Sequence, residues 1–322
     1  MFLRTLKYDA TFAMNHMTVR IPFLLNWYAN PYHTPIFVAK EMDYFKREGV
    51  NLAVIEPTDP SDVTELVGTG RADIGLKAMI HTIAARAKGF PIKAIGILLD
   101  EPPTGLLCYN KERTSVVSSI QDLKGKRIGY VGEFGKYILD DLLRKNGVNP
   151  DDVKTSRVGM RVPHVLARGL IDAGIGLENC QLIEVEDMID APGAASFLKF
   201  DESMGIHCCF CSVLYIANER FLNERPEEAR GFMRAIKRAT DLTLHEPDRA
   251  FNLLCNALPR LKDETNRKIF HASLPYVAKD LATKEKDWYE VKEYMQGLKL
   301  LDSNFDIDKC YTNSLVPRSI IV

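Results

Sequence analysis

The chain has 322 residues, of which 46% are hydrophobic and 26% charged, and its formal net charge is −1. This composition is typical of a globular protein with ample material for a core, and the length is comfortable for two domains. There is no dense basic stripe, which argues against nucleic acid as a partner, because phosphate binding leaves a lysine and arginine footprint. No apolar run reaches the roughly 20 residues that span a bilayer, so we expect no membrane partner either.

The first residues, "MFLRTLKYDATFAMNHM", contain neither the apolar core nor the cleavage site of a secretory signal. We expect residues 1–17 to be a disordered extension of the fold. The seven cysteines are an odd number, and with the missing export signal they favour a reducing compartment, which we take to be the cytoplasm. In such a compartment clustered cysteines bind metals or react more often than they form disulfides.

Strand and helix patterns alternate up to residue 100. We expect strands at 18–27, 50–57, 72–77 and 92–99, and helices at 36–49, 60–70 and 79–89. An alternating order of this kind predicts a mostly parallel sheet with helices on both of its faces.

A second unit follows from about Pro102. Its expected elements are a strand, glycine-rich turn and helix at 123–147, a helix and strand at 163–177, an irregular region at 178–204, a strand at 211–218, a long amphipathic helix at 225–247 and a helical remainder at 248–302. Trp288 is expected to pack inside this helical remainder.

The long helices after residue 218 have no sheet of their own, and the first α/β unit has no C-terminal partner. The simplest architecture is α/β with two lobes between which the chain crosses twice. Lobe 1 would contain 18–102 and 212–322, and lobe 2 would contain 104–205. A ligand would bind in the cleft between the lobes, where strand ends converge, with residues 207–211 beside the second crossing.

The segment "GYVGEFGKYILDDL" (129–142) predicts a strand, then Gly132, Glu133, Phe134 and Gly135, then a helix. Glycines let backbone N–H groups turn toward an anion, and a helix N-terminus adds partial positive charge. This combination suits a phosphate. An ordinary strand-to-helix turn explains the pattern equally well, since it matches neither dinucleotide-binding nor P-loop motifs.

Two further groups lie where strands end. Lys77 ends a strand and His81 follows four residues later, so both can share one face of a starting helix, and a desolvated lysine can form a Schiff base with an aldehyde. Asn26 and Trp27 begin the loop after the first strand, where an indole can stack on a flat ring. Solvated or merely packed side chains are the simpler interpretation of both groups.

The segment "HCCFC" (207–211) gathers His207, Cys208, Cys209 and Cys211. Residues two apart in a straight strand lie roughly 6.6 Å from each other, so only a bent backbone would let several of them hold one ion. The spacing is not that of a zinc finger, and thiolate with imidazole also suits iron or copper. A buried strand that happens to use cysteine is the alternative, but we favour metal or redox chemistry.

Several stretches together resemble one known family: "FLLNWYANPYHTPIFVAK", "EPTDPSDVTELVGTGRADIGLKAMIHTIAARAKGFP", "LDEPPTGLL", "LKGKRIGYVGEFGK", "IDAGIGLE" and "CCFCSVLYIANERFL". The resemblance is to the hydroxymethylpyrimidine phosphate synthases of thiamin biosynthesis, the no-message-in-thiamine type. It extends from about residue 18 to about 245. It implies the two-lobed fold of type II periplasmic binding proteins, in agreement with the double crossing.

The resemblance also implies roles for the singled-out residues. Pyridoxal 5′-phosphate would be bound as a substrate, as a Schiff base on Lys77, with its phosphate on Gly132 to Gly135 and its ring lined by Asn26 and Trp27. His81 would donate atoms of its imidazole to the pyrimidine, so that each chain acts once.

By the same resemblance, the cysteine cluster would bind the iron needed for oxidation by dioxygen, and the protein would be a homodimer. The family motif reads CCCFC, and here His207 replaces the first cysteine; imidazole is also an iron ligand, but a changed ligand set alters the metal's reactivity. Two alternatives remain: a non-catalytic small-molecule carrier on the same fold, and a degenerate family member that binds pyridoxal phosphate without reaction.

Overall fold

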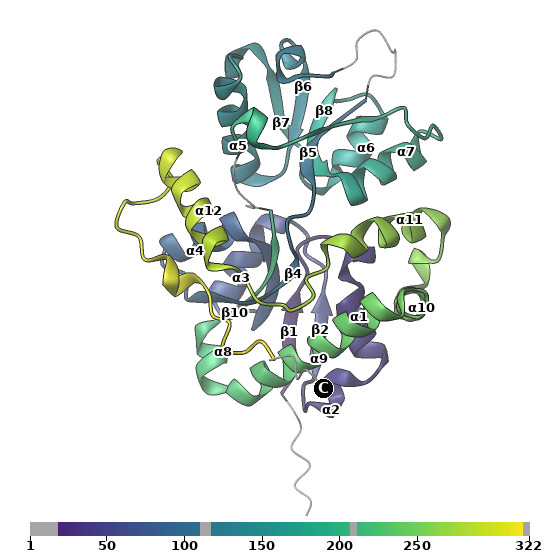
Figure 1. The fold of residues 1–322 in the computed structure, drawn as a ribbon, viewed down its shortest axis with the longest axis vertical. Coiled ribbons are helices and arrows are strands. Elements are labelled where there is room, and N and C mark those ends of the chain that lie inside the picture. The colour runs from purple at the N-terminus through teal and green to yellow at the C-terminus, as the bar shows by residue number, and fades with distance from the viewer. Residues whose placement is uncertain (1–18, 110–116, 207–210, 318–322) are drawn as a thin grey trace, which may run out of the picture.

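The computed structural model describes residues 19–109, 117–206 and 211–317. These residues form two five-stranded sheets, each in its own lobe, with helices around both (Figure 1). Residues 1–17 and residues 207–210 of the cysteine cluster lie outside the described residues.

The sheet of lobe 1 has the strand order β2-β1-β3-β10-β4. Its strands are β1 (Ile21–Leu24), β2 (Leu52–Ile55), β3 (Ile74–Ala78), β4 (Ile92–Leu99) and β10 (Val213–Asn218). β10, which follows all of lobe 2 in the sequence, therefore lies between two early strands and completes this sheet.

The sheet of lobe 2 has the order β7-β6-β8-β5-β9. Its strands are β5 (Thr104–Cys108), β6 (Arg127–Tyr130), β7 (Lys154–Arg157), β8 (Ala173–Leu177) and β9 (Ser196–Lys199). The chain passes from β4 to β5 and returns from β9 to β10, which gives the two crossings between the lobes.

Both sheets are mixed: in each, four strands run in one direction, as expected for a mostly parallel sheet, and one strand runs against them. β10 runs antiparallel to β3 and β4, and β5 runs antiparallel to β8 and β9, whereas the other pairings are parallel. The reason is the double crossing: each of these two strands enters its sheet from the opposite lobe, and therefore runs against the βαβ units already there.

Helices cover both sheets. Around the first sheet they are α1 (Thr34–Glu41), α2 (Tyr44–Arg47), α3 (Val63–Gly68), α4 (Met79–Ala87), α8 (Glu219–Glu224), α9 (Pro226–His245), α10 (Pro247–Ala257), α11 (Glu264–Ser273) and α12 (Glu285–Gly297). Around the second they are α5 (Gly132–Lys145), α6 (Val162–Ala167) and α7 (Ile183–Met188). Within the described residues, no helix combines the length and apolar character needed to cross a membrane.

The region 178–204, expected to be irregular, is partly ordered into short elements. A π-helical turn (Glu178–Leu182) leads into α7, and β9 pairs with β5 at the edge of the second sheet. Elements of four to six residues carry too few positions for a hydrophobic period to show in the sequence.

Trp288 anchors α12 to lobe 1. Its side chain is fully buried, and its ring stacks on Tyr311 with centroids 4.8 Å apart and an interplanar angle of 9°. The isolated bridge between Tyr311 and Ala94 on β4 ties this pair to the sheet. The C-terminal segment thus holds the last helix against the core.

Replacing Trp288 by alanine should lower the free energy of unfolding by about 3–5 kcal/mol, because a large buried ring is exchanged for a cavity. Denaturant unfolding followed by circular dichroism measures the loss. The neighbouring Tyr289→Ala, whose side chain is 38% exposed, is the matched control and should change little. Equal losses in the two variants would show that the stacked pair contributes nothing special.

Candidate active site between the lobes

Lys77 is carried into the interior by β3, where Leu214 of β10 lies opposite it in the antiparallel register. The residue is only 4% exposed. Its Nζ donates a hydrogen bond to the carbonyl oxygen of Pro60. Pro60 opens a short 3-10 turn whose N-cap, Asp59, accepts the backbone N–H of Ser61 at 2.9 Å. The position of the amine therefore depends on this turn.

Burial lowers the pKa of Lys77 to about 8, although the carboxylates of Asp59 and Asp62 act in the opposite direction. Removing an ammonium from water disfavours its charged form. A usable fraction of the amine is therefore neutral, and nucleophilic, near pH 7.

His81 lies in the first turn of α4, which begins directly after β3. Burial, and secondarily the charge of Lys77, hold the pKa of its imidazole well below the usual value, so the ring is neutral. Among the described residues its buried Nδ1 has no hydrogen-bond partner. The ring meets Phe134 of lobe 2 edge to face, with centroids 5.0 Å apart.

The GEFG segment does not precede a helix, as its sequence suggested, but is the first turn of α5. Gly132 has a φ of +64°, and a Cβ on it would lie 3.0 Å from Ser61 Oγ. A glycine is therefore needed for both the backbone conformation and the close approach of the two lobes. The first-turn N–H groups of this 14-residue helix have no intrahelical acceptors and suit an anion.

Arg157 is a residue of this region that the sequence did not indicate. From the end of β7 its Nη2 donates to Asp59 Oδ2 at 2.6 Å and to Ser61 Oγ at 3.2 Å in the other lobe. It also lines a cavity of about 310 Å³ together with Gly132, Glu133 and Lys136. Its contacts depend on two turns that lie far apart in the sequence, so no local pattern reveals them.

Asn26 and Trp27 line a different cavity, of about 150 Å³, which residues of both lobes and Cys211 also border. Asn26 Oδ1 lies 3.0 Å from His33 Nε2, which orients the amide. The buried Nε1 of Trp27 finds no acceptor in the described part of the chain. Ala78 and Val131, the sequence neighbours of Lys77 and Gly132, border the same cavity. The predicted residues thus gather around one cleft but not in one cavity.

Of the predicted metal ligands, His207, Cys208 and Cys209 lie outside the described residues. Cys211 is described, and it borders both the 150 Å³ cavity and a second cavity of about 450 Å³. Burial raises the pKa of its thiol to about 12. The hydrogen bond with Thr104 acts in the opposite direction but is the smaller effect, so the thiol is protonated near pH 7; a metal cation beside it would stabilise the thiolate.

Glu184 and Tyr28 join the lobes across the cleft. The Tyr28 hydroxyl donates to the Glu184 carboxylate, lying 2.8 Å from both of its oxygens. Glu184 is partly buried against lobe 1 rather than on the solvent side of its helix. Burial raises the pKa of Glu184 to about 7, although the bond from Tyr28 acts in the opposite direction.

Two lobes, each with its own five-stranded sheet and in contact with each other, define a class of proteins by fold. The alkanesulfonate-binding protein SsuA from Xanthomonas axonopodis pv. citri matches with a TM-score of 0.70 at 16% identity, over 91% of this chain and 98% of that one. A Candida albicans protein with the generic periplasmic binding protein fold matches with a TM-score of 0.69 at 14% identity, over 93% and 97% of the two chains. The chain therefore has the periplasmic-binding-protein fold.

Sequence comparison narrows this class. The NMT1/THI5-like family model matches residues 30–250. A Legionella pneumophila relative is 47% identical over 95% of each chain, and an Aspergillus parasiticus relative is 46% identical over 92% of this chain and 87% of its own. Both carry the name 4-amino-5-hydroxymethyl-2-methylpyrimidine phosphate synthase. This chain belongs to the NMT1/THI5-like family.

Glu184→Gln should flatten part of the pH dependence of stability. Because the folded pKa of Glu184 is about 7 and its usual value is about 4.3, the folded state binds the proton more tightly, and this contribution to stability is lost as the pH rises from about 4 through 7. Glutamine cannot titrate, so the variant should lose less stability over that range.

Urea unfolding between pH 4 and 8 measures this difference. Glu186→Gln, two residues along α7, removes a carboxylate that accepts the backbone N–H of Gly193 within lobe 2 and is the matched control. A profile for Glu184→Gln that parallels the parent and the control would contradict the assignment.

Proposed function

We propose that this chain synthesises 4-amino-5-hydroxymethyl-2-methylpyrimidine phosphate for thiamin, the activity in the names of its relatives. The observation that carries the proposal is the Lys77–His81 pair. A buried amine with a pKa of about 8 acts electrostatically on a neutral imidazole four residues later in the chain, whose Nδ1 has no partner among the described residues. A reactive amine beside an unpartnered imidazole is a costly arrangement for a protein that only binds.

Pyridoxal 5′-phosphate is the substrate that these residues fit. Lys77 is the amine that would capture its aldehyde carbon. The N-terminus of α5, at Gly132 to Gly135, would accept the phosphate, with Arg157 beside it as a further cation. The unpartnered Nε1 of Trp27 and the amide of Asn26 would hold the polar edge of the ring in the adjoining cavity.

His81 would be the second reactant, consumed in a single turnover. The low pKa keeps its ring neutral, with a nitrogen lone pair available, and Phe134 fixes the ring from the opposite lobe. Closure of the two lobes excludes water from both reacting rings, which protects reactive intermediates from hydrolysis.

Iron is the redox partner that the cysteine cluster would hold, through Cys211 and the neighbouring His207, Cys208 and Cys209. Thiolate and imidazole are both ligands for iron, and bound iron would supply electron transfer to dioxygen. Cys211 borders the cavity that Asn26 and Trp27 line, which would put the metal beside the substrate ring.

A carrier of small molecules is the second candidate, because the alkanesulfonate-binding SsuA shares the fold. A carrier has no use for an amine of lowered pKa, so we favour the synthase. We further propose that the protein is cytoplasmic. We also propose that it is a homodimer, which light scattering of the purified chain would test.

Lys77→Ala should abolish the absorbance change that pyridoxal phosphate produces when it is bound to the parent protein. In the parent, the rate of adduct formation should rise with pH and level off above about 8, because the neutral amine reacts and burial lowers its pKa. Stopped-flow absorbance across pH 6 to 10 measures both effects. Lys88→Ala, an exposed lysine just after α4, is the control; an unchanged signal in Lys77→Ala would refute the role of Lys77.

Peptide mass spectrometry across residues 78–86 tests the fate of His81. After loading with pyridoxal phosphate and addition of ferrous iron and air, we expect a mass loss confined to His81, with pyrimidine phosphate released in step. The peptide that contains the buried His33 serves as the internal control. An intact His81 with pyridoxal phosphate still bound would favour a carrier or a degenerate family member.

A further inference from the structure

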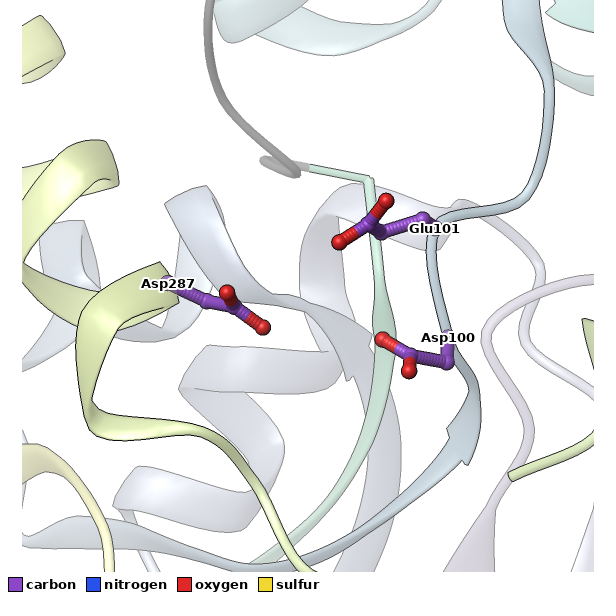
Figure 2. A group of neighbouring side chains, drawn as sticks. All are labelled: Asp100, Glu101 and Asp287. Carbon is purple, nitrogen blue, oxygen red and sulfur yellow. The ribbon is translucent and has the colours of Figure 1, made fainter. Parts of the chain in front are cut away.

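Three carboxylates of lobe 1 converge at the first crossing between the lobes. Asp100 and Glu101 follow β4, and Asp287 lies in the first turn of α12. One oxygen of each lies within 4.8 Å of one oxygen of the other two. Figure 2 shows Asp287 pointing from its helix toward the other two side chains.

Asp287 is the unusual member of this group. It is only 6% exposed, and its carboxylate forms no hydrogen bond or ion pair with any described residue. The charge of Lys284 favours the carboxylate form of Asp287, whereas the carboxylates of Asp100 and Glu101 disfavour it. Its place near the N-terminus of α12 gives it some support from the helix dipole, but the dipole does not explain why two further carboxylates face it.

Asp100 adds a second unsatisfied atom. Its Oδ2 accepts a hydrogen bond from Lys284 Nζ at 2.9 Å, within an ion pair. Its Oδ1 is buried and has no partner within the residues that the structure describes. The Lys284 side chain is 60% exposed and can move into solvent. Lys286 is a second cation whose charge acts on Asp287 and Glu101, but its side chain is 82% exposed and pairs with Glu290 at 3.2 Å. Two exposed lysines therefore face three carboxylates.

We propose that Asp100, Glu101 and Asp287 form a binding site for a hard divalent cation of the size of Ca²⁺ or Mn²⁺. Carboxylate oxygens are the preferred ligands of such ions, and calcium–oxygen bonds are about 2.3–2.6 Å long. Two ligands on opposite sides of one ion therefore stand up to about 5 Å apart, which the observed 4.8 Å allows. The site uses oxygen donors only, so it is distinct in chemistry from the cysteine cluster and does not depend on the proposed function.

The position gives the cation a structural consequence. Glu101 has a φ of +47°, which is strained for a residue other than glycine, and its N–H donates to Ser212 Oγ at 3.1 Å. Ser212 precedes β10, at the second crossing. A cation would therefore tie the segment between β4 and β5 to α12, beside the contact between the two crossings, and stiffen the connection between the lobes.

Titration of chelator-treated protein with Mn²⁺, followed by the electron paramagnetic resonance signal of the free ion, tests the proposal. We expect one site in the parent, competition by Ca²⁺, and a rise in melting temperature when Mn²⁺ binds. Asp287→Asn, which keeps the side-chain shape, should lose at least about tenfold in affinity, since even groups behind metal ligands contribute that much.

Two further variants separate the trio from other ligands. Glu293→Gln removes an exposed carboxylate of the same helix, and it should bind Mn²⁺ as the parent does. Lys284→Gln removes a competing cation and should bind more tightly. An absence of Mn²⁺ binding in the parent, unchanged binding in Asp287→Asn, an equal loss in Glu293→Gln, or weaker binding in Lys284→Gln would each overturn the proposal.

Discussion

The burial of one lysine amine is the constraint on which the rest of the site depends. Lys77 lies on β3, which is a central strand because β1 pairs with one of its edges and β10, returning from lobe 2, pairs with the other. A buried ammonium needs a partner, and among the described residues the amine of Lys77 donates its hydrogen bond to the carbonyl oxygen of Pro60. Asp59 caps the turn that presents this carbonyl, and Arg157 of lobe 2 donates a hydrogen bond to the same carboxylate. The state of the amine is therefore linked to the closure of the lobes.

Closure also determines the state of the imidazole. His81 is neutral because it is removed from water, and Phe134 of lobe 2 packs on its edge. The same contact brings the N-terminus of α5 to within reach of the 3-10 turn, where Gly132 and Ser61 nearly touch. Hydrogen bonds elsewhere between the lobes, from Tyr28 to Glu184 and from Asn179 to Ser273, help to fix the position of one lobe against the other. The contacts that join the lobes therefore lie beside both Lys77 and His81.

What the sequence could predict follows from the range of each interaction. Lys77 and His81 could be singled out together because they are close in sequence, at the end of β3 and the start of α4. The double crossing could also be inferred, since the late helices needed a sheet. The pairing of Arg157 with Asp59 spans 98 residues, and that of Tyr28 with Glu184 spans 156; neither has a local signature. The direction of β10 and β5 was missed because strand patterns carry no information on polarity.

The fold explains why a protein of this family would use a clamp. A binding protein closes because its ligand contacts both lobes only in the closed form. The ligand therefore binds the closed form more tightly than the open form and shifts the equilibrium toward closure. On the proposed function, pyridoxal phosphate would contact Lys77 from lobe 1 and the N-terminus of α5 from lobe 2. The substrate would therefore favour the same closed state, in which His81 is shielded from water and the 3-10 turn that bonds Lys77 is held in place. On this proposal, the closing motion of a carrier would become the step that brings the substrate, Lys77, His81 and the proposed iron ligands together.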